Sequence, residues 1–125
     1  MLNQVNTFPV INLKKNLDTK ALVLDNLGVV KGKLNDKEAE GVLLEACRIR
    51  DSLENKIGLN ASFIHLCEFY IDKKEFDKGL PWAERAYANA QELKSLVAQK
   101  EALHYITELQ SIHQQKYIKE YKKVS

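Results

Sequence analysis

Residues that break helices or cross-link chains are scarce in this sequence of 125 residues. It has five glycines, two prolines and two cysteines. Two cysteines are too few for a disulfide framework. Cys47 and Cys67 both fall on apolar faces of predicted helices, where we expect buried, reduced side chains. Because the alternation of β-branched residues that marks strands is also missing, the sequence predicts an all-α protein.

The sequence also lacks a long apolar run and a large charge excess. No run approaches the ~20 apolar residues that cross a bilayer, and the first residues do not have the order of a secretory signal. The formal net charge is +2, whereas nucleic-acid-binding proteins usually carry a clustered basic face. We therefore expect no nucleic acid partner and no membrane contact by this segment. These residues alone predict a cytoplasmic location, and a periplasmic one if the segment belongs to a membrane-anchored sensor.

Motifs of catalysis are missing too. The sequence has no glycine-rich phosphate loop, no zinc-binding H-E-x-x-H and no nucleophile elbow. His65 and Cys67 lie two positions apart, about 200° around a helix, so they cannot share a metal ion. Trp82 and the tyrosines at 70, 87 and 105 stand at helical spacing, as core residues do. We therefore expect no enzyme activity, no metal and no cofactor.

What the sequence does have is helical periodicity, which is clearest in residues 59–93. Apolar side chains recur at helical spacing in both halves of this segment, as on one face of a helix. The polar residues 72–75 between the halves are too few for anything but an antiparallel return. The segment therefore predicts a hairpin of two helices. The face residues are Phe63, Leu66, Cys67 and Tyr70 in the first half and Phe76, Leu80, Ala83, Tyr87 and Ala90 in the second.

Two further helices are predicted before this hairpin. Residues 37–53 form the most regular amphipathic stretch, and Gly58 is expected to end it in a left-handed conformation. Residues 19–34 are expected to form a helix capped by Asp18, preceded in residues 1–18 by a lead-in or a short helix with Pro9 in its first turn. The expected faces are Leu24, Leu27, Gly28, Lys31 and Leu34, and Ala39, Val42, Leu43, Ala46, Cys47, Arg50 and Leu53.

A last helix is predicted from Ser95, a helix cap, to about Lys122. Residues 95–125 contain no Gly, Pro, Asn or Asp, so one long helix is expected, with a break at residues 113–115 as the alternative. Tyr117, Ile118 and Tyr121 continue its apolar row to the end of the chain.

The strongest signal is an internal repeat of 39 residues. Large residues match large ones and small residues match small ones at this offset, and two-helix repeats bury their apolar faces by stacking on their neighbours. His65 and His104 are also 39 apart, so we expect them at equivalent places. The matching pairs include Leu24 and Phe63, Leu27 and Leu66, Gly28 and Cys67, Asp36 and Glu75, Leu43 and Trp82, and Cys47 and Ala86.

The residues of the second repeat carry a family pattern. A leucine and a small residue are followed by an aromatic, then by a second aromatic and small residues; these are Leu66, Cys67, Tyr70, Phe76, Gly79 and Ala86. This pattern resembles that of tetratricopeptide repeats. The first repeat departs from it, because Lys31 and Lys37 stand where aromatics belong, and the spacing exceeds the family's usual ~34 residues. The resemblance implies a short array of antiparallel helical hairpins over residues 19–54, 58–93 and 95–125.

The resemblance also implies a function, because the first helices of tetratricopeptide repeats line a concave groove that holds a protein or peptide. We expect a non-catalytic protein–protein interaction module, part of a larger bacterial signalling or regulatory protein, since longer variants resemble the repeats of sensor kinases and transcriptional regulators. A stand-alone cytoplasmic adaptor and a small-molecule-sensing helical bundle are the alternatives. By position, the groove lining would be Asp25, Val29, Lys33, Ile64, Glu68, Asp72, Leu103 and Thr107.

The two ends carry apolar residues that no further repeat covers. Ile112, Tyr117, Ile118 and Tyr121 lie in the last helix, and Phe8, Val10, Ile11 and Leu13 lie near the start. Exposed apolar rows of this extent usually mark an interface. The sequence therefore predicts either self-association through one end or membership of a longer array. For self-association we expect a homodimer through the C-terminal helix, since a twofold dimer is the commonest closed assembly.

Overall fold

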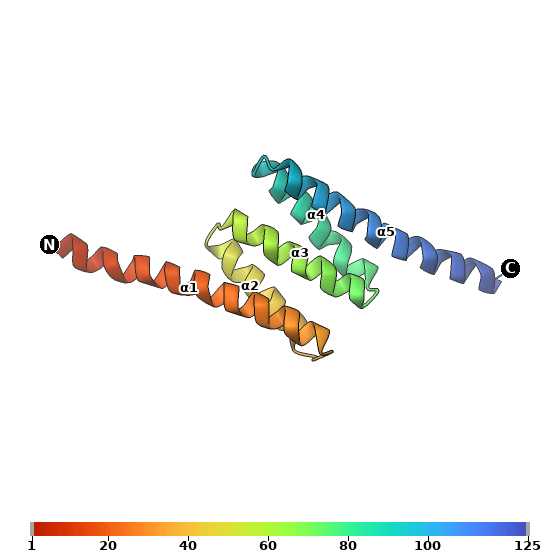
Figure 1. Cartoon of the computed structure of the whole chain (residues 1–125), viewed down its shortest axis with the longest axis horizontal. Coiled ribbons are helices and arrows are strands. Elements are labelled where there is room, and N and C mark those ends of the chain that lie inside the picture. The colour runs from red at the N-terminus through yellow and green to blue at the C-terminus, as the bar shows by residue number, and fades with distance from the viewer. Residues whose placement is uncertain (1, 125) are drawn as a thin grey trace.

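The chain forms five α-helices in the computed structural model, which describes residues 2–124 and the side chains of residues 13–124. No strand occurs in residues 2–124, so the prediction of an all-α protein is confirmed. The helices are α1 (Leu2–Lys33), α2 (Ala39–Ser52), α3 (Lys56–Asp72), α4 (Phe76–Glu92) and α5 (Leu96–Val124) (Figure 1).

Each helix packs against the next one along the chain, and α3 also contacts α1 and α5. The long helices α1 and α5 lie on opposite sides of this row and make no contact with each other within the described residues. Their free ends project beyond the three shorter helices in opposite directions (Figure 1). The helices therefore form an open row in which α3 is central.

Most helix boundaries agree with the sequence-based predictions. The hairpin of residues 59–93 is confirmed as α3 and α4, and Ser95 caps α5 by accepting a hydrogen bond of 3.1 Å from the Ala98 N–H to its Oγ. The last helix is continuous through residues 113–115. The absence of helix-breaking residues after Ser95 was therefore a reliable signal.

The predicted start of the first helix is wrong. A single helix begins at Leu2, not at Pro9 or Thr19, because nothing in residues 17–20 stops a helix that is already formed. Asp18 therefore caps no helix; its Oδ1 accepts a hydrogen bond of 3.0 Å from the Asn55 side chain. The side chains of Phe8, Val10 and Ile11 lie outside the described residues.

Gly58 is also not the left-handed residue that the sequence predicted. It lies in the first turn of α3, where its N–H donates a hydrogen bond of 2.9 Å to the Oδ1 of Asn55, the residue that caps this helix. The left-handed position is Glu54, with φ of 54°. The cap at Asn55 fixes the start of α3, so the left-handed residue that turns the chain is the one before it.

All four turns between helices share one backbone design. Each has one left-handed residue, at Asn35, Glu54, Lys74 or Lys94, with φ between 53° and 58°. At α3, for example, the Lys74 N–H donates to the Ile71 carbonyl and the Glu75 N–H to the Tyr70 carbonyl, both at 2.9 Å. This pair of bonds is the Schellman motif, in which glycine is the favoured left-handed residue.

We expect Lys74→Gly to raise the free energy of unfolding by about 0.5–1 kcal/mol. Glycine removes a left-handed strain of ~1–2 kcal/mol, but part of this gain is lost because glycine gives up more backbone entropy on folding. Urea denaturation measures the change. The matched control is Lys100→Gly, at an exposed position in the second turn of α5, where we expect a loss of ~1 kcal/mol. An equal loss at both positions would show that the turn is not left-handed in solution.

The core lies between the central helices and contains both cysteines. Leu43, Cys47, Phe63 and Leu66 belong to one buried cluster, and Cys67 belongs to a second one with Leu109. Burial raises the pKa of the Cys47 thiol to about 11 and that of Cys67 to about 12. Both thiols are unpaired and buried, which confirms that they act as small core residues.

Aromatic residues and Gly28 take the predicted packing roles, but the outer residues of α1 do not. Tyr70 is buried, and Trp82, Tyr87 and Tyr105 pack against the core. A Cβ on Gly28 would lie 2.6 Å from the Leu43 Cδ2, so this glycine does allow α2 to approach. Leu27 and Leu34, expected on the same face, are exposed instead.

Candidate functional site

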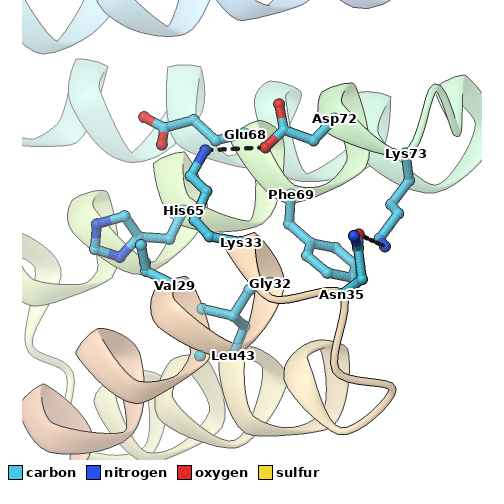
Figure 2. Close-up of a pocket in the computed structure, with 11 residues that line it drawn as sticks. Val29, Gly32, Lys33, Asn35, Leu43, His65, Glu68, Phe69, Asp72 and Lys73 are labelled. Atoms are coloured by element: carbon cyan, nitrogen blue, oxygen red, sulfur yellow. Dashed lines mark hydrogen bonds and ion pairs between the residues drawn. The ribbon is translucent and has the colours of Figure 1, made fainter.

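A pocket of about 160 Å³ opens between α1 and α3, towards their adjoining C-terminal ends (Figure 2). Gly28 and Gly32 leave space one helical turn apart on α1, so Leu43 of α2 reaches the lining. Phe69 of α3 packs beside Gly32, where an added Cβ would lie 3.3 Å from the ring. The inner part of the pocket is therefore apolar.

The rim of the pocket is polar and holds two contacts between the helices. Lys33 Nζ lies 3.1 Å from Asp72 Oδ2, and Lys73 Nζ donates to Asn35 Oδ1 at 3.2 Å (Figure 2). All four side chains are exposed, and exposed pairs of this kind contribute roughly 0–1 kcal/mol. A ligand with polar groups can therefore take over these partners at little cost.

Glu68 of α3 forms another part of the lining, and a residue of α5 holds its side chain in place. Tyr105 of α5 donates a hydrogen bond of 2.8 Å from its hydroxyl to Glu68 Oε1. Burial, followed by this bond to Glu68, raises the pKa of the Tyr105 hydroxyl, so it stays protonated and donates at neutral pH. The contact connects α5 to the wall of the pocket.

The structure brings together half of the groove residues that the sequence predicted. Val29, Lys33, Glu68 and Asp72 all line the pocket. Leu103 and Thr107 are exposed on α5 and do not line it, and Asp25 and Ile64 are buried. Asp25 and Ile64 were predicted to line the groove because helical spacing gives the direction of a side chain but not how closely the next helix packs over it.

Asp25 has a different role, because it is the centre of a buried polar network between three helices. Its Oδ2 accepts a hydrogen bond from Arg50 Nη1 at 2.7 Å and lies 2.9 Å from His65 Nδ1. Arg50 also donates to Ser62 Oγ at 3.0 Å and to the Gly58 carbonyl at 2.9 Å. The network therefore ties α1, α2 and α3 to one another beside the pocket.

This network is almost fully removed from water. The Asp25 and Arg50 residues are 1% and 6% exposed, and the second carboxylate oxygen of Asp25, Oδ1, has no hydrogen-bond partner within the described residues. A buried carboxylate is stable only when it is paired and hydrogen-bonded. Its charge therefore depends on Arg50, with His65 as a second partner.

His65 connects the network to the pocket, since it contacts Asp25 and also lines the pocket. The hydrogen bond to Asp25 raises the pKa of His65 above its ordinary value of 6.5, although partial burial works against this shift. Glu68 raises the pKa further and Arg50 lowers it. The charge at this wall of the pocket therefore changes with pH above 6.5.

We expect the stability that His65 contributes to fall as the pH rises. The unfolded pKa is about 6.5 and the folded pKa is higher, so the contribution is complete below pH ~6.5 and is lost as the pH passes the folded pKa. His65→Asn keeps a hydrogen-bond donor but does not titrate. The difference in unfolding free energy between wild type and His65→Asn, measured from pH 5.5 to 8.5, should decrease.

The control for this measurement is His104→Asn, which removes an exposed histidine of α5, 39 positions after His65. His104 Nε2 lies 3.5 Å from Glu108 Oε2 on the same helix. The structure thus gives the two equivalent histidines different partners. If the difference in unfolding free energy between wild type and His65→Asn stays constant or increases with pH, the contact between His65 and Asp25 is contradicted.

Sequence reasoning missed the pairing of Asp25, Arg50 and His65, although one signal was present. Arg50 stands on an otherwise apolar face of its helix, three positions after Cys47. A charged residue is almost never buried without a partner, so a basic residue on a buried face indicates a buried acidic one. Which acidic residue this is depends on the packing of α1 on α2.

Nothing in residues 2–124 indicates metal chemistry or a membrane span. This range holds no group of three or more His, Cys, Asp or Glu side chains that could bind a metal ion, and no helix in it is long and apolar enough to cross a bilayer. Comparison of the chain with family models, curated proteins and solved structures finds no match. The pocket geometry is therefore the main evidence on function.

Proposed function

We propose that the chain is a tetratricopeptide-like helical repeat module that binds a segment of another protein in the pocket between α1 and α3, without catalysis. The supporting observation is where the pocket lies. It is shared by the first helices of two successive repeats, and four predicted groove residues line it together. Lys33 and Asp72, which pair across it, are themselves 39 positions apart.

The size and lining of the pocket favour a peptide over a small molecule. A volume of about 160 Å³ is below the range of roughly 300–1,000 Å³ that is usual for small-molecule sites. It suits a single anchoring side chain on Gly32, Leu43 and Phe69, while the polar rim meets the backbone or charges of the same segment. At this pocket, the size therefore favours a side chain of a protein ligand over a small molecule.

The resemblance to repeats of bacterial sensor kinases and regulators supplies the proposed context. In such a protein the module acts as a scaffold, holding a partner segment while other parts carry out the response. The exposed ion pair on the rim is suited to this role, because weak surface pairs exchange readily with charges on a ligand.

Panning a displayed library of random peptides on the purified chain tests the proposal. Enriched peptides should share one anchoring apolar residue and bind in solution, as measured by fluorescence anisotropy. Gly32→Leu places a side chain in the pocket, where the Cβ already meets Phe69 at 3.3 Å. We expect this variant to weaken binding at least tenfold.

Gly41→Leu is the matched control, because it makes the same change where nothing lies within 4 Å of an added Cβ. It should leave peptide affinity unchanged, and circular dichroism should show both variants folded. If no peptide is enriched, or if both variants bind equally well, the proposed function is wrong.

A further inference from the structure

His65 stands at the wall of the pocket with its two ring nitrogens in different surroundings. Nδ1 lies 2.9 Å from Asp25 Oδ2 in the buried network. The residue also lines the pocket, and its side chain is 28% exposed. Figure 2 shows His65 and Glu68 at one end of the pocket and Lys73 at the other. The nitrogen that Asp25 leaves available to a ligand is therefore Nε2.

The contact with Asp25 decides which nitrogen carries the hydrogen in the neutral ring. Asp25 Oδ2 also accepts a hydrogen bond of 2.7 Å from Arg50 Nη1, so it belongs to a carboxylate that accepts and does not donate. His65 Nδ1 is therefore the N–H donor of this pair, and Nε2 is a bare acceptor when the ring is neutral. The next proton goes to Nε2.

Protonation of His65 therefore changes the pocket and not the network. It leaves the bond from Nδ1–H to Asp25 in place and turns Nε2 from an acceptor into a charged donor. The pocket then holds a cationic N–H beside its apolar inner part, which Leu43 and Phe69 line. Hydrogen bonds from such a donor to a carboxylate are roughly twice as strong as those between neutral groups.

The charged groups around His65 are balanced, so its proton sets the sign of the site. Three cationic and three anionic side chains, all from α1, α2 and α3 with its C-cap, face His65 or line the same pocket: Lys33, Arg50 and Lys73, and Asp25, Glu68 and Asp72. The described lining includes no residue of α4 or α5. Tyr105, through which α5 reaches Glu68, stays protonated and uncharged. A protonated His65 therefore gives the site an excess positive charge.

Glu68 is the group within the pocket that competes for a protonated His65. Its charge raises the pKa of His65. Its Oε1, however, accepts a hydrogen bond of 2.8 Å from the Tyr105 hydroxyl. A carboxylate on a ligand therefore competes with a side chain that α5 already engages.

We propose that the pocket selects a segment with an acidic side chain beside its apolar anchor, whose carboxylate accepts a hydrogen bond from His65 Nε2–H, and that it releases this segment as His65 loses its proton. The inference rests on the proposed function, because it specifies the partner of the same pocket. An amide in place of the carboxylate removes the charge that the protonated ring recognises.

The pH range follows from the contacts of His65. The bond to Asp25 raises the pKa of His65 above 6.5, so the ring of the free protein is cationic below pH ~6.5 and loses its charge as the pH passes the raised value. A bound carboxylate favours the charged form and raises the pKa of His65 further. The affinity for a carboxylate is therefore highest below pH ~6.5 and falls above it.

Isocaproate is the first probe, because it joins a branched apolar chain to one carboxylate, and isocaproamide is its uncharged match. NMR titration of the full chain with each probe, read on the His65 ring between pH 6 and 8.5, gives the affinity and the pKa of His65. We expect isocaproate to raise this pKa and to bind roughly fivefold more tightly at pH 6 than at pH 8.5. Isocaproamide should show neither effect.

His65→Asn and His104→Asn are the matched variants. His65→Asn should bind isocaproate with one low affinity over the whole pH range, because asparagine does not titrate. His104→Asn should behave as wild type, since His104 does not line the pocket. Circular dichroism checks the folding of both variants. The comparison of acid and amide on wild type needs no variant, so it decides the inference even if His65→Asn does not fold.

Panning the displayed peptide library at pH 6 and at pH 8.5 is the second arm of the test. Asp or Glu should be enriched beside the anchor at pH 6 only, and peptides fused to the coat protein through their C-terminus offer no terminal carboxylate. If peptides bind but acid and amide probes respond equally to pH, or if Asp and Glu are not enriched, the inference is wrong and the proposed function stands. If neither a probe nor a peptide binds, both are wrong.

Discussion

Arg50→Ala is expected to lower the free energy of unfolding by about 3–5 kcal/mol, the cost of leaving a buried charge without its partner. The Asp25 carboxylate accepts its shortest hydrogen bond, at 2.7 Å, from Arg50 Nη1. Its Oδ1 already has no hydrogen-bond partner within the described residues. Without Arg50, only Ser62 and His65 would remain to stabilise the charge. Urea denaturation at pH 7 measures the loss.

Two controls separate this effect from the simple loss of an arginine. Arg48→Ala, two positions along the same helix, breaks an exposed pair with Glu45 at 2.6 Å, and we expect a change of at most ~0.5 kcal/mol there. Arg50→Met combined with Asp25→Asn removes both charges, so its cost should be well below that of Arg50→Ala. If Arg50→Ala costs no more than Arg48→Ala, the two residues do not form a buried pair.

Truncation of the core leucines has the second large effect. Leu43→Ala and Leu66→Ala should each destabilise the fold by about 2–5 kcal/mol, through lost apolar contact and the cavity left behind. Both side chains are fully buried in the cluster between α2 and α3. Leu43 also packs against Gly28 and reaches the pocket, so its truncation should enlarge the pocket as well.

The control for the leucine variants is Leu96→Ala in the first turn of α5, where the side chain is exposed. Surface substitutions of this kind usually change stability by less than ~0.5 kcal/mol. Chemical denaturation of the three variants under one condition gives the comparison. A loss at Leu66 as small as that at Leu96 would mean that the helix faces are assigned wrongly.

The sequence predicted α3 and α4 well because their periodic apolar residues pack into the core. In α3 all four periodic residues are buried, and in α4 two of the five are buried while the other three are partly buried against the core. Periodicity therefore identified both helices and the sides on which they pack. In α1 there are two rows. The exposed row contains Leu27 and Leu34, whereas the buried side has Ala21, Asp25 and Gly28. Hydrophobicity alone selects the wrong row, because close packing of helices favours small residues over large ones.

The candidate site was predictable to the extent that it follows the repeat. Val29 and Lys33 on α1, with Glu68 and Asp72 on α3, could be assigned by transferring positions over a fixed interval. The link from Asp25 through Arg50 to His65 could not, because it depends on the relative rotation and height of three helices. These are set by contacts such as Gly28 with Leu43, which no single helix pattern determines.

The order of helices in the row has a consequence for how the chain folds. Since each helix packs mainly on its neighbour in sequence and α1 does not meet α5 within the described residues, few contacts require a long loop to close. Helical proteins of such low contact order fold in microseconds to milliseconds. The α3–α4 hairpin, whose first helix touches both sides of the row, is the natural nucleus, with α1 and α5 adding to it from either side.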